Sequence, residues 1–318
     1  MKTDAAVIAP ARAKADPIRL GVAFACVYFI WGSTFLAIRF AIETLPPLWM
    51  AGVRFLIAGA LLYGWVVFRG GAARPSLGQW GVATLQGGLF FLIGNGATTW
   101  AELRVPSGMA ALVVSTIPLM MVLFDWASGG ARPTRSVVLA VALGFAGIAL
   151  LVVGPGGSAS GRIDPIGALA LLAADIAWSA GSIYTARAAR PANPLQSNAM
   201  QMLAGGALLL IASAAIGEWG RLDLGSASLR STLSMLYLSI FGSIIAFTAY
   251  SWLLHATTPA RVSTYAFVNP IIAVFLGWVF AGEVLTPLTF VAAFVIIVAV
   301  VIIIGQRARA ERGAETAG

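Results

Sequence analysis

The sequence predicts an all-α integral membrane protein with ten transmembrane helices, arranged as two inverted five-helix repeats. Three observations predict this class: a composition that is 59% hydrophobic and only 10% charged, apolar blocks long enough to cross a bilayer, and an internal repeat. Soluble domains average about 25% charged residues. A soluble core of this size would lack the polar surface to cover it, whereas lipid solvates an apolar exterior.

The charged and reactive residues exclude several other classes. The net charge is +8, but the basic residues stand singly or in pairs between apolar blocks, which is typical of membrane proteins and not of a nucleic-acid surface. Cys26 and His255 are the only cysteine and histidine, so we expect no disulfide framework, metal site or cofactor. The first apolar run, from Ile18 past Ile38, is too long for a signal-peptide core and predicts a retained span.

Each predicted span contains about 20 mainly apolar residues, which is the length needed to cross the hydrocarbon core. Glycine and proline residues occur at the breaks between spans, for example at Pro46-Pro47 and Gly154–Gly157. The ten predicted spans are 18–41, 47–69, 79–102, 106–127, 136–154, 165–186, 195–217, 231–254, 260–281 and 287–305.

The distribution of Lys and Arg between the loops predicts the orientation. With the N-terminus inside, fourteen of the 20 Lys and Arg residues fall in inner segments, five fall in outer segments, and Arg54 lies within a span. The positive-inside rule therefore places both termini in the cytoplasm of a bacterial cell with the protein in its inner membrane. The charged tails, 1–17 and 306–318, are expected to lie against anionic lipid.

The chain contains the same pattern twice. A shift of 147 residues places Trp31 on Trp178, and beyond the second span a shift of 152 places two further tryptophans and Pro118 on their counterparts. Six of the ten tryptophans pair in this way, which indicates a duplication. The predicted repeats are 18–154 and 165–305, joined by a linker at 155–164.

Five spans in each half is an odd number, so the second half enters the membrane upside down relative to the first. Inverted repeats of this kind are a recurring plan of transporters, in which two similar halves exchange conformations and expose one central site to each side in turn. A duplication that only builds a large bundle is the alternative.

Short motifs occur in matching order in the two halves. The first half carries Phe29–Phe35, Arg54-Phe55 with Ala58-Gly59, and Pro106–Ala111 leading to Pro118; the second carries Pro259–Ser263 leading to Asn269-Pro270, then Gly282–Thr286. With these motifs both halves resemble the EamA domain of the drug/metabolite transporter superfamily, over about residues 18–305. One departure is that Gly130-Ala131 stands where the second half has Gly282-Glu283, so any role of Glu283 is not duplicated.

The resemblance implies a fold and an activity. It implies ten helices around a central cavity, lined by helices one, three, four, six, eight and nine, with five and ten peripheral. It also implies alternating-access export of small metabolites, often amino acids, and the chain is similar to exporters of aromatic amino acids. Flat or quaternary cations such as paraquat are the alternative cargo. The expected partners are the substrate, the bilayer and protons as candidate coupling ions, for a monomer or weak homodimer.

Asp175 lies near the middle of the sixth span, where a carboxylate costs about 2.5–3.5 kcal/mol on insertion scales. Such a residue usually faces a cavity, where it binds a substrate amine or carries a proton; a protonated acid packed between helices is the alternative.

Arg54 lies about 10 Å into the second span, at 1.5 Å per residue. We expect a structural ion pair with Glu102 or Glu283, and binding of a substrate carboxylate is the alternative.

Aromatic and polar residues at similar depths are further candidates for substrate binding. Aromatic walls stack on flat or cationic ligands, and polar groups within a membrane either join helices or line a pathway. Packing against lipid or other helices is the alternative. The candidates are Tyr28, Trp31, Asn95, Trp100, Trp178, Tyr250, Tyr265 and Asn269.

Pro118 and Pro270 occupy matching positions in spans four and nine. A proline frees a backbone carbonyl and bends a helix, so the two are predicted as hinges or as static bends.

Three other functions were weighed against transport. An intramembrane enzyme needs a nucleophile with a base, or a metal set, and one His and one Cys far apart supply neither. A channel needs a filter or charge ring, and none is visible. A non-transporting scaffold is the third.

Overall fold

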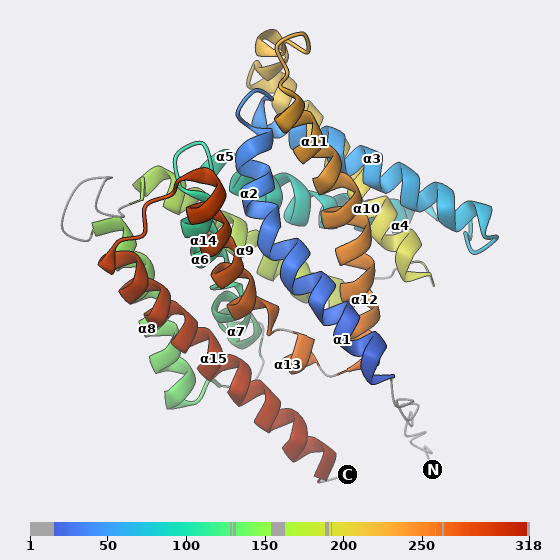
Figure 1. Ribbon diagram of the computed structural model, residues 1–318. Helices are drawn as coiled ribbons and strands as arrows, with labels where there is room; N and C mark the ends of the chain where they lie inside the picture. Colours follow the sequence, from blue (N-terminus) through green and yellow to red (C-terminus); the bar gives the residue numbers. More distant parts are fainter. Residues whose placement is uncertain are drawn as a thin grey trace, which may run out of the picture.

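The computed structural model describes residues 16–127, 129, 132–153, 163–187, 191, 193–257, 259–262 and 264–316. Within these residues the chain forms helices and short connections, with no strand. Ten helical stretches occur, one at each predicted span, which confirms the all-α class with five helices in each half (Figure 1).

The first half contains five of these stretches. The first and third are continuous helices whose central turns are π-helical, and the fourth is broken at Ser115-Thr116. In order they are α1 (Pro17–Ala25), η1 (Cys26–Ile30) and α2 (Trp31–Ala41); α3 (Pro47–Phe68); α4 (Leu77–Gly87), η2 (Gly88–Asn95) and α5 (Gly96–Ala101); α6 (Ser107–Val114) and α7 (Ile117–Ala127); and α8 (Arg135–Val153).

The second half follows a similar plan, except that its first stretch, α9, is α-helical throughout and a short 3₁₀ helix follows its second stretch. The segments are α9 (Pro165–Arg187); α10 (Pro194–Ala215); η4 (Glu218–Arg221); α11 (Leu229–Tyr237), η5 (Leu238–Ile245) and α12 (Ala246–Ala256); α13 (Pro259–Val262) and α14 (Tyr265–Ala281); and α15 (Pro287–Thr316).

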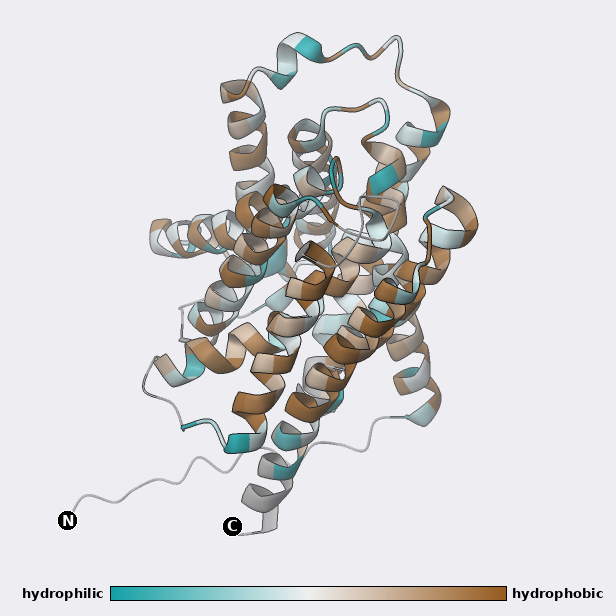
Figure 2. Cartoon of the chain, turned by 90° about the vertical axis from the view of Figure 1, so that its left-hand side faces the viewer, coloured by the Kyte–Doolittle hydropathy of each residue, from teal (hydrophilic) through white to brown (hydrophobic). Residues whose placement is uncertain are grey.

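Eight of the ten stretches are long and apolar enough to cross a membrane by length and composition. Of the other two, α14 has only 17 residues, and Leu77–Ala101 is made less apolar by Gln79, Gln86 and Asn95. Hydrophobic residues cover the middle of the helices and polar residues gather at their ends (Figure 2). The helix that begins at Pro17 and the helix that ends the described chain point to the same end of the molecule (Figure 1).

Helices α3 and α10 cross antiparallel through small residues. A Cβ on Gly59 would lie 3.0 Å from the backbone nitrogen of Leu203, and a Cβ on Gly206 would lie 3.0 Å from that of Leu56. These two contacts are reciprocal, because the shift of 147 residues turns Gly59 into Gly206 and Leu56 into Leu203. Close approach of backbones at small residues is the usual way in which helices associate within lipid.

Helices α8 and α15 show the same reciprocity at the edge of the bundle. Gly144 faces Ala299 while Gly147 faces Ile296, and the shift of 152 residues exchanges these two pairs. A π-helical segment also recurs at matching places, as η2 in the third stretch and η5 in the eighth. Equivalent local sequences therefore make equivalent contacts in the two halves.

The two predicted hinge prolines differ in their surroundings. Pro270 lies inside α14, whereas Pro118 is the second residue of α7, directly after the break at Ser115-Thr116. Because proline at the start of a helix lacks only an N–H that would have no partner there, Pro118 fits the restart of the helix without distorting it. The positions of the two prolines do not show whether the helices move there, so the hinge role stays a prediction.

Candidate substrate-binding site

A cavity of about 160 Å³ lies in the centre of the bundle. Eight of the ten helical stretches supply its walls, and the peripheral α8 and α15 supply none of the lining residues. The second and seventh stretches, which were not expected to line it, contribute through α3 and α10. The lining residues are Trp31, Thr34, Phe35, Ile38, Arg54, Phe55, Phe91, Gly94, Asn95, Thr98, Val114, Ile117, Ala174, Asp175, Trp178, Met202, Gly242, Ser243, Phe247, Tyr265 and Asn269.

Arg54 provides a positive charge to this cavity. Its side chain is 4% exposed, and its Nη2 donates a hydrogen bond of 2.8 Å to Oδ1 of Asn95. The Asn95 amide is itself held, because its Nδ2 donates to the carbonyl of Phe90 within the π-helical η2. Within the described chain the Nε of Arg54 has no partner. A buried guanidinium with an unused donor is costly unless an anion approaches it.

Asp175 provides a carboxyl group from α9. It is fully buried, and its Oδ2 accepts a hydrogen bond of 2.9 Å from Oγ1 of Thr116 at the break between α6 and α7. Its Oδ1 has no partner among the described residues. Asp175 and Arg54 line the same cavity, yet no ion pair within 4.0 Å joins them in the part of the chain that the structure describes.

Aromatic rings form much of the cavity wall. Trp31 lies 5.0 Å from Tyr250 and 5.3 Å from Tyr265, measured between ring centroids. The indole Nε1 of Trp31 donates to the carbonyl of Gly242 in the π-helical η5. On the facing side Trp178 packs edge-on against Phe90 at 5.0 Å. Carbonyls displaced by π-helical turns are thus used to fix two cavity side chains, Trp31 and Asn95.

Six of the nine residues that the sequence suggested for substrate binding line the cavity: Trp31, Asn95, Asp175, Trp178, Tyr265 and Asn269. Tyr28, Trp100 and Tyr250 do not. Tyr28 bonds Oγ1 of Thr264 at 2.5 Å, Trp100 packs beneath Arg104, and Tyr250 lies behind Trp31. No bound substrate tests these assignments, which stay predictions.

Several lining residues were missed by the sequence reasoning. Thr34 follows Trp31 by three positions and Thr98 follows Asn95 by three, so both share a helix face with a residue that was selected. That spacing is the signal that would have found them. Phe91 precedes Asn95 by four positions and Phe247 precedes Tyr250 by three, so they carry a similar signal, whereas no residue of α10 was selected that could have pointed to Met202.

The predicted ion pair of Arg54 with Glu102 or Glu283 is not formed in the described part of the chain. Glu283 instead caps α6: its Oε1 accepts from the N–H and hydroxyl of Ser107 at 2.6 and 2.7 Å, and its Oε2 accepts from the N–H of Gly108 at 3.0 Å. The exposed N–H groups at the start of a helix satisfy a carboxylate without any counter-charge. Glu102 is fully buried, and neither of its carboxylate oxygens has a partner among the described residues.

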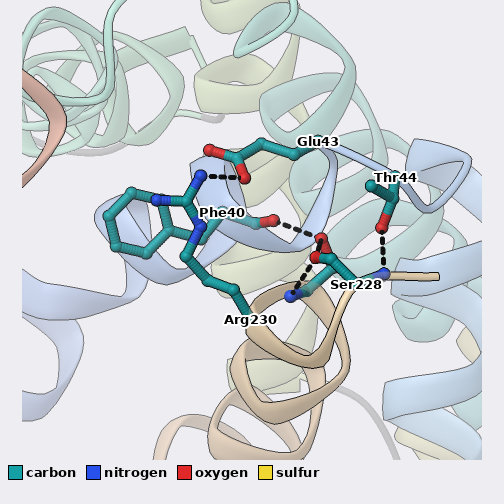
Figure 3. Close-up of polar contacts among 6 residues, drawn as sticks. Phe40, Glu43, Thr44, Ser228 and Arg230 are labelled. Atoms are coloured by element: carbon teal, nitrogen blue, oxygen red, sulfur yellow. Dashed lines mark hydrogen bonds and ion pairs between the residues drawn. The ribbon is translucent and has the colours of Figure 1, made fainter.

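Other polar ties join the two halves at the same end as Glu283. Glu218 accepts from the N–H groups of Leu48 and Trp49 at the start of α3. Figure 3 shows a further tie, between the end of α2 and the start of α11, in which Arg230 pairs with Glu43 and lies over the ring of Phe40. These contacts join the two halves at one end of the bundle.

A helical bundle with the length and apolarity to cross a membrane, enclosing a site that combines two buried charges with aromatic walls, defines the small-molecule membrane transporters as a class. The chain belongs to the EamA-like transporter family, which matches residues 19–153 and again residues 165–305. It is therefore a multi-pass inner-membrane transporter of this type, built from two EamA repeats.

The relatives agree with this assignment. The chain is 42% identical over 287 residues to YedA of Escherichia coli (strain K12), named an uncharacterized inner membrane transporter, with 89% of each chain covered. It is 25% identical to the uncharacterized transporter YvbV of Bacillus subtilis, over 93% of this chain and 94% of that protein. It is 27% identical to the protein PecM of Dickeya dadantii, over 86% and 88%.

A solved crystal structure shares the fold, with a TM-score of 0.61 and 20% identity over 91% of this chain and 98% of that chain.

Proposed function

We propose that the chain exports neutral amino acids, aromatic ones among them, by alternating access around the central cavity. The observation that carries the proposal is that Arg54 and Asp175 line one cavity and that each keeps one atom without a hydrogen-bond partner among the described residues. An amino acid is a zwitterion, so its carboxylate fits the guanidinium and its ammonium fits the carboxylate. Each interaction is a charge-assisted hydrogen bond, the stronger kind. The aromatic wall then contacts the side chain of the amino acid.

Flat or quaternary cations are the weaker candidate cargo. Asp175, Trp31 and Trp178 suit a cation, since a carboxylate and ring faces both attract positive charge. Arg54 opposes it, because its own positive charge lies in the same confined space with no carboxylate within 4.0 Å among the described residues. Repulsion between like charges is strong where water is scarce. We therefore favour the zwitterion.

The two halves are proposed to be inverted relative to each other. The antiparallel crossing of α3 and α10, which are equivalent helices, supports this, because equivalent helices lie antiparallel only when one repeat is turned over. The reciprocal contacts Gly59–Leu203 and Gly206–Leu56 are what a pseudo-two-fold axis between these helices would produce, and they support the proposal. Such an axis lets the halves exchange conformations about a fixed site.

The end of the bundle closed by Glu283 is proposed to be the outer gate, with both termini in the cytoplasm. Glu283 follows α14 in the second half and caps α6 in the first half, so it joins two elements that must separate when that end opens. Its counterpart by sequence is Ala131, so the first half carries no carboxylate at the matching sequence position. The charge distribution of the loops supports this orientation.

A ligand panel tests the proposed cargo. The purified protein in detergent is heated with neutral amino acids, with their deaminated and decarboxylated analogues, with quaternary cations and with nucleosides, and the melting temperature is recorded. A ligand that binds only the folded state raises it. We expect stabilisation by intact amino acids and by neither analogue. Stabilisation by cations alone, or by nothing in the panel, would refute the proposal.

A further inference from the structure

A second hollow, of about 850 Å³, lies on the lipid-facing side of the bundle. The walls of this lateral groove are α1 and α3, and its floor is η5 with α12. On α1 the lining residues recur with helical spacing, so they form one face. The groove is lined by Ile18, Arg19, Val22, Ala23, Cys26, Leu61, Leu62, Trp65, Leu195, Ile244, Ile245, Thr248, Ala249 and Trp252.

The groove is apolar over most of its length and lies on membrane-spanning stretches. Val22 is 59% exposed and Leu61 is 55% exposed, so the groove is open to the surrounding membrane. An aliphatic chain is the ligand that such a surface accepts in a bilayer. The same π-helical η5 separates the groove from the cavity, since Ile244 and Ile245 face the groove while Gly242 and Ser243 face the cavity.

One end of the groove is basic. Arg19 is the only charged residue among those lining it, and the guanidinium of Arg69 lies 4.7 Å from the ring of Trp65, which also lines it. Arg19 and Trp65 belong to the first turns of α1 and the last turns of α3, so they mark one end of two helices that run in opposite directions. Asp16 approaches Arg19 only at 3.8 Å and in an exposed position, where ion pairs contribute little.

We propose that this lateral groove binds a phospholipid with an anionic headgroup, whose acyl chain fills the apolar length while Arg19 and Arg69 hold the phosphate. Charge complementarity selects this occupant: Arg19 and Trp65 line the groove, Arg69 lies against Trp65, and arginine binds phosphate through paired hydrogen bonds. By the predicted orientation this end faces the cytoplasmic leaflet, where basic residues near the surface attract anionic lipid.

Native mass spectrometry of the full chain tests the proposal. The protein is released from detergent containing equal amounts of phosphatidylglycerol and phosphatidylcholine with identical acyl chains, and the lipids retained are counted. The wild type is expected to retain phosphatidylglycerol preferentially. Arg19→Gln and Arg69→Gln are each expected to lower that preference about fivefold, the effect of one basic residue at an anionic surface.

Two further variants locate the site. Val22→Trp fills the groove from an exposed position and keeps both arginines, so it should lower retention of phosphatidylglycerol. Arg221→Gln removes an exposed arginine of η4, away from the groove, and should leave retention unchanged. Three results would each overturn the proposal. They are equal retention of both lipids by the wild type, an unaltered lipid preference in Val22→Trp, and a dimer that carries no lipid, in which a second copy of the chain would cover the groove.

Discussion

Arg54 and Asp175 illustrate at the scale of single residues how a membrane protein tolerates buried charge. Neither has an ion-pair partner within 4.0 Å in the described chain; each is held by one neutral side chain, Asn95 and Thr116 respectively. These bonds fix the direction of each charged group and leave an atom of each without a partner. Preorganised but unsatisfied groups are suited to bind a ligand that brings the missing charges.

Replacing Arg54 tests the carboxylate half of this arrangement. Arg54→Gln is expected to raise KM for a neutral amino acid by about 10- to 100-fold, because a hydrogen bond between charged groups contributes about 1.5–3 kcal/mol. The measurement is uptake of labelled amino acid into proteoliposomes. Arg104→Gln, which removes a half-exposed ion pair with Asp164, is the matched control and should leave KM unchanged. An unaltered KM in Arg54→Gln would show that Arg54 is structural.

Asp175 is tested through a change in preference. The wild type should bind an amino acid better than its deaminated analogue by about tenfold or more, since a charge-assisted bond to the ammonium is worth about 1.5–3 kcal/mol. Asp175→Asn should abolish this difference while expression holds, as read from competition against labelled uptake. The same variant compared across pH tests proton coupling. If Asp175→Asn keeps the full preference for the amino acid over its deaminated analogue, Asp175 does not bind the ammonium group. If the pH dependence of its transport is unchanged, Asp175 does not take part in proton coupling.

At the scale of elements, two kinds of helix contact have different consequences. Helices α3 and α10 meet backbone to backbone at Gly59 and Gly206. Helices α6 and α14 also approach closely, at Gly108 and Val274, and there the carboxylate of Glu283 adds hydrogen bonds to the start of α6. Water can replace those hydrogen bonds when the end opens. We therefore expect α3 and α10 to act as the pivot and Glu283 as the releasable tie.

The pivot is tested by adding a single methyl group. Gly206→Ala would place a Cβ 2.9 Å from the carbonyl oxygen of Gly52 and 3.0 Å from the nitrogen of Leu56, both backbone atoms that cannot move independently. Overpacking of this kind costs about 1–3 kcal/mol, so the melting temperature should fall by several degrees. Gly64→Ala is the control, because its added Cβ would meet nothing within 4 Å, and its melting temperature should not fall. Equal melting temperatures for the two would contradict the pivot.

The releasable tie is tested by access to the cavity. In a Cys26→Ala background, Ile38→Cys places one thiol on a cavity-lining position, and a membrane-impermeant reagent is applied from outside. Glu283→Gln weakens the cap of α6 and should speed labelling severalfold, because the closed end opens more often. Glu218→Gln weakens the cap of α3 beside the pivot and is expected to have a smaller effect. Identical rates in all three backgrounds would show that Glu283 does not control that end.

The sequence predicted the depth of residues better than the direction in which they point. Asp175, Trp31 and Asn95 were found because polar and large aromatic residues stand out in apolar runs, and they line the cavity. Tyr250 packs against Trp31 but is not among the lining residues. In helices that are apolar all round, hydrophobic periodicity does not fix the rotation about the helix axis. The π-helical turns of η1, η2 and η5 shift that rotation further.

For the whole molecule, the number of spans and the two five-helix halves were predictable, because span length and repeated tryptophans are one-dimensional signals. The partner of Glu283 was not. Arg54 was expected to pair with Glu102 or Glu283, yet Glu283 binds the backbone N–H groups at the start of α6. Every residue except proline carries the same backbone N–H group, so a pattern of residue types does not predict which N–H groups a carboxylate will bind. Contacts of this kind appear only once the helices are placed.

The most direct test of the account is counterflow of a labelled neutral amino acid into proteoliposomes that contain the purified chain and are preloaded with the same amino acid. A carrier with one central zwitterion site predicts saturable counterflow that Arg54→Gln and Asp175→Asn each reduce by about tenfold or more, in line with the loss of one charge-assisted bond. No counterflow for any amino acid, or transport of quaternary cations that Arg54→Gln accelerates, would contradict it.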